Sequence, residues 1–369
     1  MWRQVLALIV KELLAVLKDA KSRVVLVGPP LVQLMVFGYA ATFDLNHVPI
    51  AVYDADRSQA SRDLIARFTG SPSFDEAVVL RSERPIKQLI DSRRVALALV
   101  IRRDFTRNLL RREPAPVQLI VDGRNSNTAL VILGYANAIV GDFSLDWLAR
   151  HGGRLPPAVL EQRAWYNPAL LSRWFIVPGI VALLTQVVSL LVVGLSVARE
   201  REAGTFDQLL MTPMRQFDIL LGKGLPGLLI GTLEATVIIL AAVLWFEIPL
   251  RGSLVALYVG LVLFVAAVTG IGLAISSLAA TQQQALLGAF LFMVPSIILS
   301  GFATPIANMP EAVQVLTLIN PMRYFLIVVR SVFLEQGGLA SLAPQYWPMA
   351  LIGLATLFLA GWLFRRRAS

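Results

Sequence analysis

The sequence predicts a polytopic α-helical membrane protein of six transmembrane helices, with an extracytoplasmic α/β domain inserted between spans 1 and 2. The first observation is low charge: Asp, Glu, Lys and Arg make up 15% of the 369 residues, against about 25% in soluble domains. The second is a set of apolar runs that reach the roughly 20 residues needed to cross a bilayer. These runs are 24–43, 174–198, 224–246, two spans within the uncharged stretch 252–310, and about 346–364. The third is a single large polar section, 44–168, which forms the inserted domain.

The N-terminal segment, 1–23, precedes the first span and has the pattern of an amphipathic helix. Residues 2–20 carry a broad apolar stripe with charges on the other face, as in helices that lie in the membrane interface. A short cytoplasmic helix packed on a partner is the alternative. The apolar run that follows is longer than the 7–15 residues typical of a signal peptide, so we interpret 24–43 as a retained span.

Basic residues predict the orientation, because cytoplasmic flanks of membrane spans attract Lys and Arg. One cluster precedes span 1, a second lies in the segment 199–223, and a third ends the chain at Arg365 to Arg367. With six spans, all three fall on the same side. Both termini are therefore expected in the cytoplasm and 44–168 outside it, since long translocated loops escape the positive-inside bias.

The section 44–168 alternates strand and helix patterns, which is typical of a small mixed or parallel sheet. The strand candidates are VPIAVYD, EAVVL, VALALVI and PVQLIVD, and a longer helix is expected from Ser126 to about Leu148. Asp54 and Asp56 follow the first strand and allow two interpretations, a cation site or residues that shape the turn and cap the next helix. We favour the second, because Asp and Ser accept the free N–H groups of a helix start. Asp122 to Asn125 is likewise interpreted as a turn.

The remaining part, 169–369, holds spans 2–6. Thr281 to Gln284 is the polar turn expected between spans 4 and 5. Several prolines and Gly301 interrupt the region 295–338, which we interpret as a re-entrant hairpin followed by an amphipathic helix. Such backbone is tolerated at membrane depth only when it is buried in protein or lines a cavity.

Several classes of site are excluded or disfavoured by the residue types. The chain has no cysteine, and its two histidines are isolated, so no metal site, catalytic group or bound cofactor is expected. No nucleotide-binding P-loop is present, because the sequence around Gly222 and Lys223 lacks the upstream glycine and the following hydroxyl. The net charge of +9 is assigned to the membrane flanks rather than to nucleic acid.

Glu234 lies near the middle of the third span, where a carboxylate is unfavourable by about 2.5–3.5 kcal/mol on insertion scales. Such residues face a bundle interior or a wet cavity. We weigh two roles equally, a group in the transport path or a structural hydrogen bond between helices. Gln186 in span 2 and Gln33 in span 1 are the expected partners.

The segment 199–223 interrupts two spans with charged, helix-competent chain. Arg199, Glu200 and Glu202 end span 2, and Gly204 and Thr205 are expected to start a new helix, with Thr205 as its N-cap. Its apolar face holds Phe206, Leu209 and Leu210, Pro213 ends it, and a second short helix is expected at 215–221. A helix of this kind suits docking into a groove on another protein. An interfacial loop without a partner is the alternative.

These residues resemble the coupling region of ABC-2 type transporter permeases, whose pattern is roughly R-E-x-E-x-G-T-x-x-x-L-x-x-[ST]-P followed by G-K. The matching positions are Arg199, Glu200, Glu202, Gly204, Thr205, Leu209, Thr212, Pro213, Gly222 and Lys223. The stretches KELLAVLKDAKS, GPPLVQLMVFGYA, YDADRSQASRDLIARF and NPMRYF also agree, so the resemblance covers essentially the whole chain. It is strongest to the bacterial subgroup with a large domain after span 1.

The resemblance implies the permease subunit of an ATP-driven exporter of drugs or other hydrophobic compounds in the bacterial inner membrane. The implied partners are a separate ATPase that uses ATP and Mg, a second permease protomer, membrane lipid and, in many cases, a periplasmic membrane-fusion adaptor. The implied chain is not itself an enzyme. Two other classes stay open: a membrane receptor that senses a ligand through its outer domain, and an ion-coupled carrier. The second needs inverted repeats, and no convincing repeat is visible.

Overall fold

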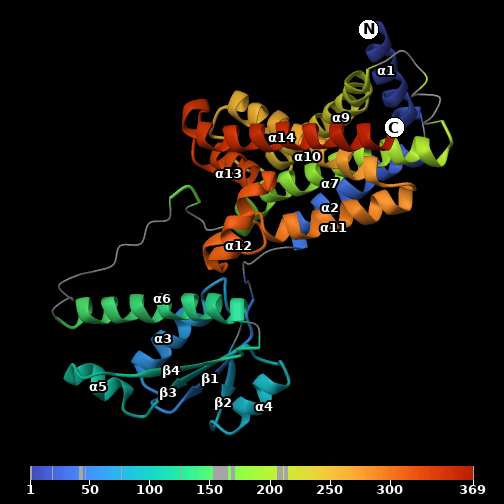
Figure 1. Cartoon of the computed structure of the whole chain (residues 1–369). Helices are drawn as coiled ribbons and strands as arrows, with labels where there is room; N and C mark the ends of the chain where they lie inside the picture. Colours follow the sequence, from blue (N-terminus) through green and yellow to red (C-terminus); the bar gives the residue numbers. More distant parts are fainter. Residues whose placement is uncertain are drawn as a thin grey trace. The chain divides into compact units, whose positions relative to one another are not determined.

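The protein divides into two compact units, which are described separately. The computed structural model describes residues 2–18, 20–40, 45, 47–75, 77–124, 126–152, 165–167, 171–205, 211 and 215–368. Phe43–Arg163 form one unit, here called the α/β unit, and Met1–Thr42 with Ala164–Ser369 form the other, called the helical unit. Figure 1 traces both along the chain.

The α/β unit is built on a four-stranded sheet with the order β2-β1-β3-β4. β1 pairs in parallel with β2 and β3, and β4 closes the sheet antiparallel to β3. β3 has every residue buried, as expected for a strand covered on both faces. The strands are β1 (Ile50–Asp54), β2 (Val78–Leu80), β3 (Leu97–Ile101) and β4 (Val117–Val121), which coincide with the four stretches expected to be strands.

Helices cover both faces of this sheet. α3 (Gln59–Thr69) and α6 (Ser126–Arg150) pack on one face, and α4 (Pro85–Asp91) packs on the other (Figure 1). α5 (Phe105–Arg111) follows β3. α6 is long and apolar enough to cross a membrane, but Ile132, Ala136 and Phe143 are buried in the same core as the sheet residues. It is therefore part of this unit.

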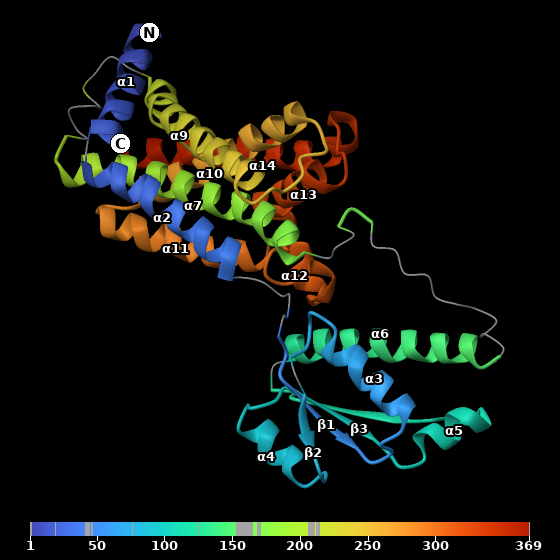
Figure 2. The same cartoon turned by 180° about the vertical axis from the view of Figure 1, so that it is seen from behind.

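The helical unit is organised around α10 (Leu254–Leu278), which contains no charged residue. α10 packs against α7 (Ser172–Glu202), α9 (Gln216–Leu244), α13 (Pro321–Leu334) and α14 (Leu339–Ala368). Seen from behind, α2 (Ala20–Ala40) and α11 (Gln282–Ile298) lie along α7 (Figure 2). Glycines allow close approach: a Cβ on Gly227 of α9 would lie 2.0 Å from a methyl group of Val193 on α7.

The predicted helical membrane protein is confirmed. In the described residues five helices are long and apolar enough to cross a membrane, one of which is α6 of the α/β unit, and the bent pair of α12–η2 and α13 is a sixth candidate. The spans predicted at 174–198 and 346–364 lie within α7 and α14, and the span predicted at 224–246 coincides with α9 up to its end at Leu244. α10 and α11 divide the uncharged stretch, although α11 is shorter than a full span. α2 covers the predicted first span up to residue 40, and residues 41–43 lie outside the described part.

Two local predictions differ from the structure. The turn between α10 and α11 is shorter than expected, because Thr281 already caps α11 by accepting a hydrogen bond from the N–H of Gln284. α9 begins at Gln216 and continues unbroken to Leu244, so no separate short helix exists at 215–221. Proline lacks a backbone N–H, which a helix tolerates best in its first turn. Pro226 lies deeper in α9, and the helix nevertheless continues past it.

The chain after α11 turns back sharply. Gly301 has a φ of 87°, and η1 (Ile306–Asn308), α12 (Glu311–Leu316) and η2 (Thr317–Ile319) follow. The α12–η2 helix and α13 meet at an angle of 83°. Asn320 accepts the N–H of Met322 at the start of α13, and its amide donates to the Ser296 carbonyl of α11 at 2.7 Å. The bend is thus fixed by hydrogen bonds within protein.

Candidate functional site

The C-terminus of α7 is closed by a glycine-based cap. Gly204 has a φ of 68°, which suits glycine. Its N–H donates to the Arg201 carbonyl at 3.1 Å, and the N–H of Thr205 donates to the Glu200 carbonyl at 2.9 Å, the two bonds of a Schellman motif. Both residues thus complete the end of α7, and the Thr205 hydroxyl donates back to the Glu200 carbonyl at 3.3 Å. That Thr205 also caps the predicted docking helix stays a prediction, because residues 206–210 lie outside the described part of the chain.

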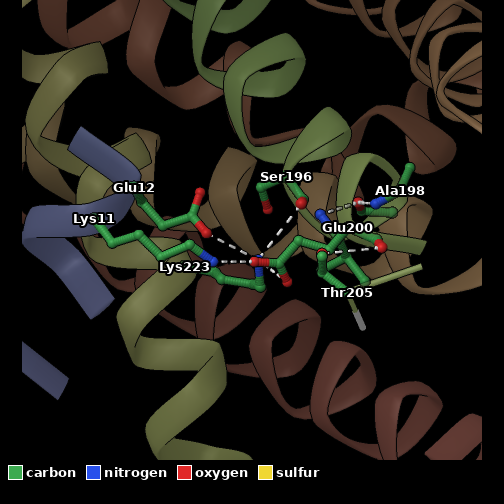
Figure 3. A network of polar contacts seen from close by, with 9 residues as sticks. Lys11, Glu12, Ser196, Ala198, Glu200, Thr205 and Lys223 are labelled. Carbon is green, nitrogen blue, oxygen red and sulfur yellow. Dashed lines mark hydrogen bonds and ion pairs between the residues drawn. The ribbon is translucent and has the colours of Figure 1, made fainter. Parts of the chain in front are cut away.

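Beside this cap, four charged side chains from three helices form one network (Figure 3). The Nζ atom of Lys223 on α9 lies 2.7 Å from Oε2 of Glu200 on α7 and 3.0 Å from Oε1 of Glu12 on α1 (Trp2–Lys18). The Lys11 ammonium lies 2.8 Å from the other Glu200 oxygen. Lys223 also donates to the Ser196 carbonyl at 3.4 Å. Together these contacts join α1, α7 and α9.

The network is electrically balanced, with two ammonium groups and two carboxylates. The Lys223 side chain has no exposed surface and the Glu200 side chain is 10% exposed, and buried charges of this kind persist only when they are paired. Lys11 is 57% exposed. Burial disfavours its charged form, but the hydrogen bond and charge of Glu200, with a smaller contribution from Glu12, outweigh this effect and raise the pKa of Lys11.

The same end of α7 is also tied to the turn between α10 and α11. The Arg201 guanidinium donates to the carbonyls of Ser277 and Ala279 at 2.8 and 3.0 Å. The Glu202 carboxylate accepts hydrogen bonds from the backbone and side chain of Gln282 at 3.0 and 3.1 Å. Arg199 is half-buried, and its carbonyl accepts the N–H of Ala203. Residues 199–205 are therefore held firmly by neighbouring helices.

The predicted docking helix itself lies outside the described residues. This applies to Phe206, Leu209, Leu210 and Pro213. The structure thus shows how the two ends of the segment 199–223 are held, one at the cap of α7 and the other at Lys223. The apolar face between them stays a prediction.

Glu234, Gln186 and Gln33 are not brought together by hydrogen bonds. Glu234 is 8% exposed on α9, and within the described residues neither carboxylate oxygen has a hydrogen-bond partner. The Gln186 amide oxygen instead accepts from Ser296 at 3.3 Å, and Gln33 is half-buried on α2. The expected pairing of Glu234 with the two glutamines is therefore wrong within this chain.

Sequence reasoning missed Lys11 and Glu12 as members of the network. The signal was present: Val5, Leu8 and Glu12 stand at i, i+3 and i+7 of α1, and all three are buried. A carboxylate in line with core positions of an amphipathic helix indicates a buried partner. Leu8 of α1 also packs directly on Gly222 of α9, since a Cβ added to Gly222 would lie only 2.4 Å from the Leu8 side chain.

Asp54 of the α/β unit has a structural role. The Asp54 carboxylate accepts the N–H groups of Asp56 and Arg57 and the Ser61 hydroxyl, so it shapes the turn before α3. No group of three or more His, Asp or Glu side chains suited to a metal occurs in the described part of the chain. A hollow of about 350 Å³ between α4 and β4 is lined by Glu83, Ile86, Lys87, Ile90, Asp91, Ile120 and Val121.

Asp122 and Arg124 form the turn that was predicted after β4. Arg124 donates to the Asp122 carboxylate from its backbone at 3.1 Å and from its guanidinium at 2.6 Å. The side-chain hydrogen bond first, and the backbone one second, lower the pKa of Asp122 to about 2. The guanidinium also donates to the Ile90 carbonyl at 2.7 Å, which ties this turn to the end of α4.

Comparison with known proteins decides the family. The profile described as "ABC-2 family transporter protein" matches residues 25–362. The chain belongs to the ABC-2 transporter family. Among curated ABC-2 relatives, "Probable multidrug ABC transporter permease YbhR" of Escherichia coli K12 is 38% identical over 369 residues and all of both chains.

Two further relatives come from the same organism. "Probable multidrug ABC transporter permease YbhS" is 34% identical over 90% of this chain and 89% of its own. "Inner membrane transport permease YhhJ" is 29% identical over 99% of this chain and 97% of its own. The resemblance noted at residues 199–223 is thus confirmed as membership of the ABC-2 family along nearly the whole chain.

Proposed function

We propose that this protein is the membrane-spanning permease subunit of an ATP-driven exporter that moves drugs or other hydrophobic or amphipathic compounds out of the cytoplasm or inner membrane. Family membership and the printed names of the YbhR and YbhS relatives support the substrate class. The sequence has no P-loop of its own. ATP and Mg are accordingly assigned to a separate ATPase subunit, and this chain is assigned transport without catalysis.

The observation that carries the proposal is the anchoring of the segment 199–223. Glu200 and Lys223, at its two ends, lie 2.7 Å apart in a balanced ionic network that also holds α1. A force applied to the intervening chain acts on α1, α7 and α9 together rather than on one loose loop. The ATPase is proposed to grip Phe206, Leu209 and Leu210, and its nucleotide-driven closure would favour one of two helix packings.

The orientation proposal rests on which elements share one end of the helical unit. Lys11 of α1 contacts Glu200 near the end of α7, and Phe364 near the end of α14 shares a core with Val197 and Leu220. The three basic clusters therefore belong to one end. We assign that end to the cytoplasm of the bacterial inner membrane, and the α/β unit to the other side, where it is available to a membrane-fusion adaptor. Two protomers are proposed to form the pathway.

The ATPase assignment is tested by Leu209→Asp in the purified complex. A carboxylate on the docking face should abolish stimulation of the ATPase while the permease still inserts and folds. Leu110→Asp is the matched control, since Leu110 is 64% exposed in the α/β unit. Normal co-purification and normal stimulation with Leu209→Asp would reject the proposed interface.

The orientation is tested by single cysteines in this naturally cysteine-free chain. Cysteine at position 111 should react with a membrane-impermeant reagent that reaches the periplasm. Cysteine at the highly exposed position 211 should react only after the inner membrane is opened. The reverse labelling pattern would invert the proposed topology without touching the permease assignment.

A further inference from the structure

α13 carries two arginines on one face of an otherwise buried helix. Its buried residues pack against α7, α10 and α14. Arg323, Ile327 and Arg330 stand at i, i+4 and i+7, which places them on the same side, and none of the three is fully buried. Arginine in an apolar helix of a membrane protein is rare and needs a partner.

The two arginines differ in what they contact. The Arg323 guanidinium donates to Thr317 Oγ1 and to the Gln314 carbonyl. The Arg330 guanidinium lies over the ring of Phe175, with its Cζ 4.0 Å from the ring centroid. Its Nε and Nη2 atoms are shielded from solvent and have no hydrogen-bond acceptor within the described residues. Two N–H donors of the planar Arg330 guanidinium group therefore have no acceptor among the described residues.

The helices that pack on α13 place no carboxylate near Arg330. Neither α10 nor α14 contains Asp or Glu. The only acids of α7, Glu200 and Glu202, are 25 or more residues from Phe175, which is about 37 Å along a helix at 1.5 Å per residue. No carboxylate on these three helices is therefore near Arg330.

A second cation lies close to Arg330, and the acidic residue Glu335 follows the end of α13. Arg251 follows α9, and its N–H donates to the Phe333 carbonyl of α13 at 3.4 Å, within one turn of Arg330. Its guanidinium lies over Trp174, 5.7 Å from the ring centroid. Trp174 and Phe175 are at the start of α7. Aromatic and arginine side chains at the end of a span are typical of the headgroup level of a bilayer.

We propose that Arg330, assisted by Arg251, binds the phosphate of an anionic lipid headgroup at the N-terminal end of α7. A phosphate offers two oxygens to the unused Nε and Nη2 donors in the bidentate arrangement that guanidinium favours. Phe175 is 41% exposed and Arg330 is only partly buried, so the guanidinium lies near the surface of the helical unit. Its covered Nε and Nη2 atoms would meet the phosphate after a turn of the side chain. The lipid would also explain how two guanidinium donors without an acceptor in the described residues are retained here.

The test uses the full-length protein in nanodiscs of phosphatidylcholine, with or without phosphatidylglycerol, and measures lipid binding by native mass spectrometry and thermal unfolding. Phosphatidylglycerol should bind and stabilise the wild type. Arg330→Gln should lower that affinity about ten- to a hundredfold, as expected for hydrogen bonds to a charged group. Arg173→Gln removes the same charge from an exposed neighbour and should bind like the wild type.

Three outcomes decide the proposal. Equal phosphatidylglycerol binding by Arg330→Gln and wild type would overturn it. Stabilisation by inorganic phosphate alone, in phosphatidylcholine discs, would overturn the lipid source and leave a free oxyanion. If Arg330→Gln unfolds, Arg330→Lys keeps the charge but lacks the fork, and its binding should be intermediate. Wild-type binding by Arg330→Lys would refute recognition through the two donors.

Discussion

Replacing Lys223 by methionine removes the ammonium that Glu12 and Glu200 share. The side chain keeps its length and apolar stem, so the main change is electrostatic. Before the change, the network holds two positive and two negative charges. Afterwards, two carboxylates remain with Lys11, which is more than half exposed. One negative charge is then left uncompensated at a buried junction.

The expected loss follows from the contact distances. Opposite charges about 4 Å apart attract by about 4 kcal/mol at an effective dielectric constant of about 20. Breaking a buried pair by removing one partner lowers the free energy of unfolding by about 3–5 kcal/mol in measured cases. The two figures agree, so we expect Lys223→Met to destabilise the junction of α1, α7 and α9 by about 3–5 kcal/mol.

A second substitution separates charge from packing. Lys223→Met combined with Glu200→Gln leaves Lys11 and Glu12 and restores neutrality, so the double variant should recover most of the lost stability. Lys18→Met on the exposed side of α1 is the control. Unfolding in detergent and stimulation of the partner ATPase are the two measurements. A loss below about 1 kcal/mol for Lys223→Met, typical of exposed pairs, would refute the reasoning.

The remaining predictions concern other parts of the chain. Gly252→Ala should destabilise by about 1–3 kcal/mol, because its Cβ would lie 2.7–2.9 Å from backbone atoms, whereas Gly194→Ala meets nothing within 4 Å; unfolding of both variants checks this. Asp122 has a lowered pKa of about 2, so the Tm difference between wild type and Asp122→Asn should be full above about pH 4 and vanish as the pH falls through about 2. A purified fragment 44–168 should fold, and circular dichroism of a random coil would contradict this. Glu234→Gln should reduce export of cationic substrates more than neutral ones in vesicles if Glu234 lines the path; equal wild-type export of both would make it structural.

The spans and strands could be predicted because they depend on local composition. Apolar runs of sufficient length have few alternatives to a helix in lipid, and the runs within α7, α9, α10 and α14 indicated those helices correctly. The four strand patterns likewise coincide with β1 to β4. α6 illustrates the limit, since its composition suits a span and only contacts with the sheet core assign it to the α/β unit.

The ends of helices were harder to predict, because they depend on contacts distant in sequence. Thr205 has the residue type of an N-cap, and the structure shows that it also follows a glycine in the left-handed region and completes the cap of α7. The polar contacts of α9 also depend on residues distant in sequence. Lys223 pairs with Glu12, 211 residues earlier, and that distance in sequence hides the pair from any local pattern.

The arrangement of these contacts bears on how the segment 199–223 would transmit movement in the proposed transporter. Lys223 is buried and contacts two carboxylates, whereas Lys11 is more than half exposed and contacts one. Water competes better for the exposed pair, so a pull on the segment would separate Lys11 from Glu200 before it separates Lys223 from either carboxylate. The α7–α9 connection then stays intact, and α1 stays attached through the Glu12–Lys223 pair alone. Because Arg201 and Glu202 hold the turn between α10 and α11, the same displacement would reach that turn directly, and the helices most affected would be those that pack along α7.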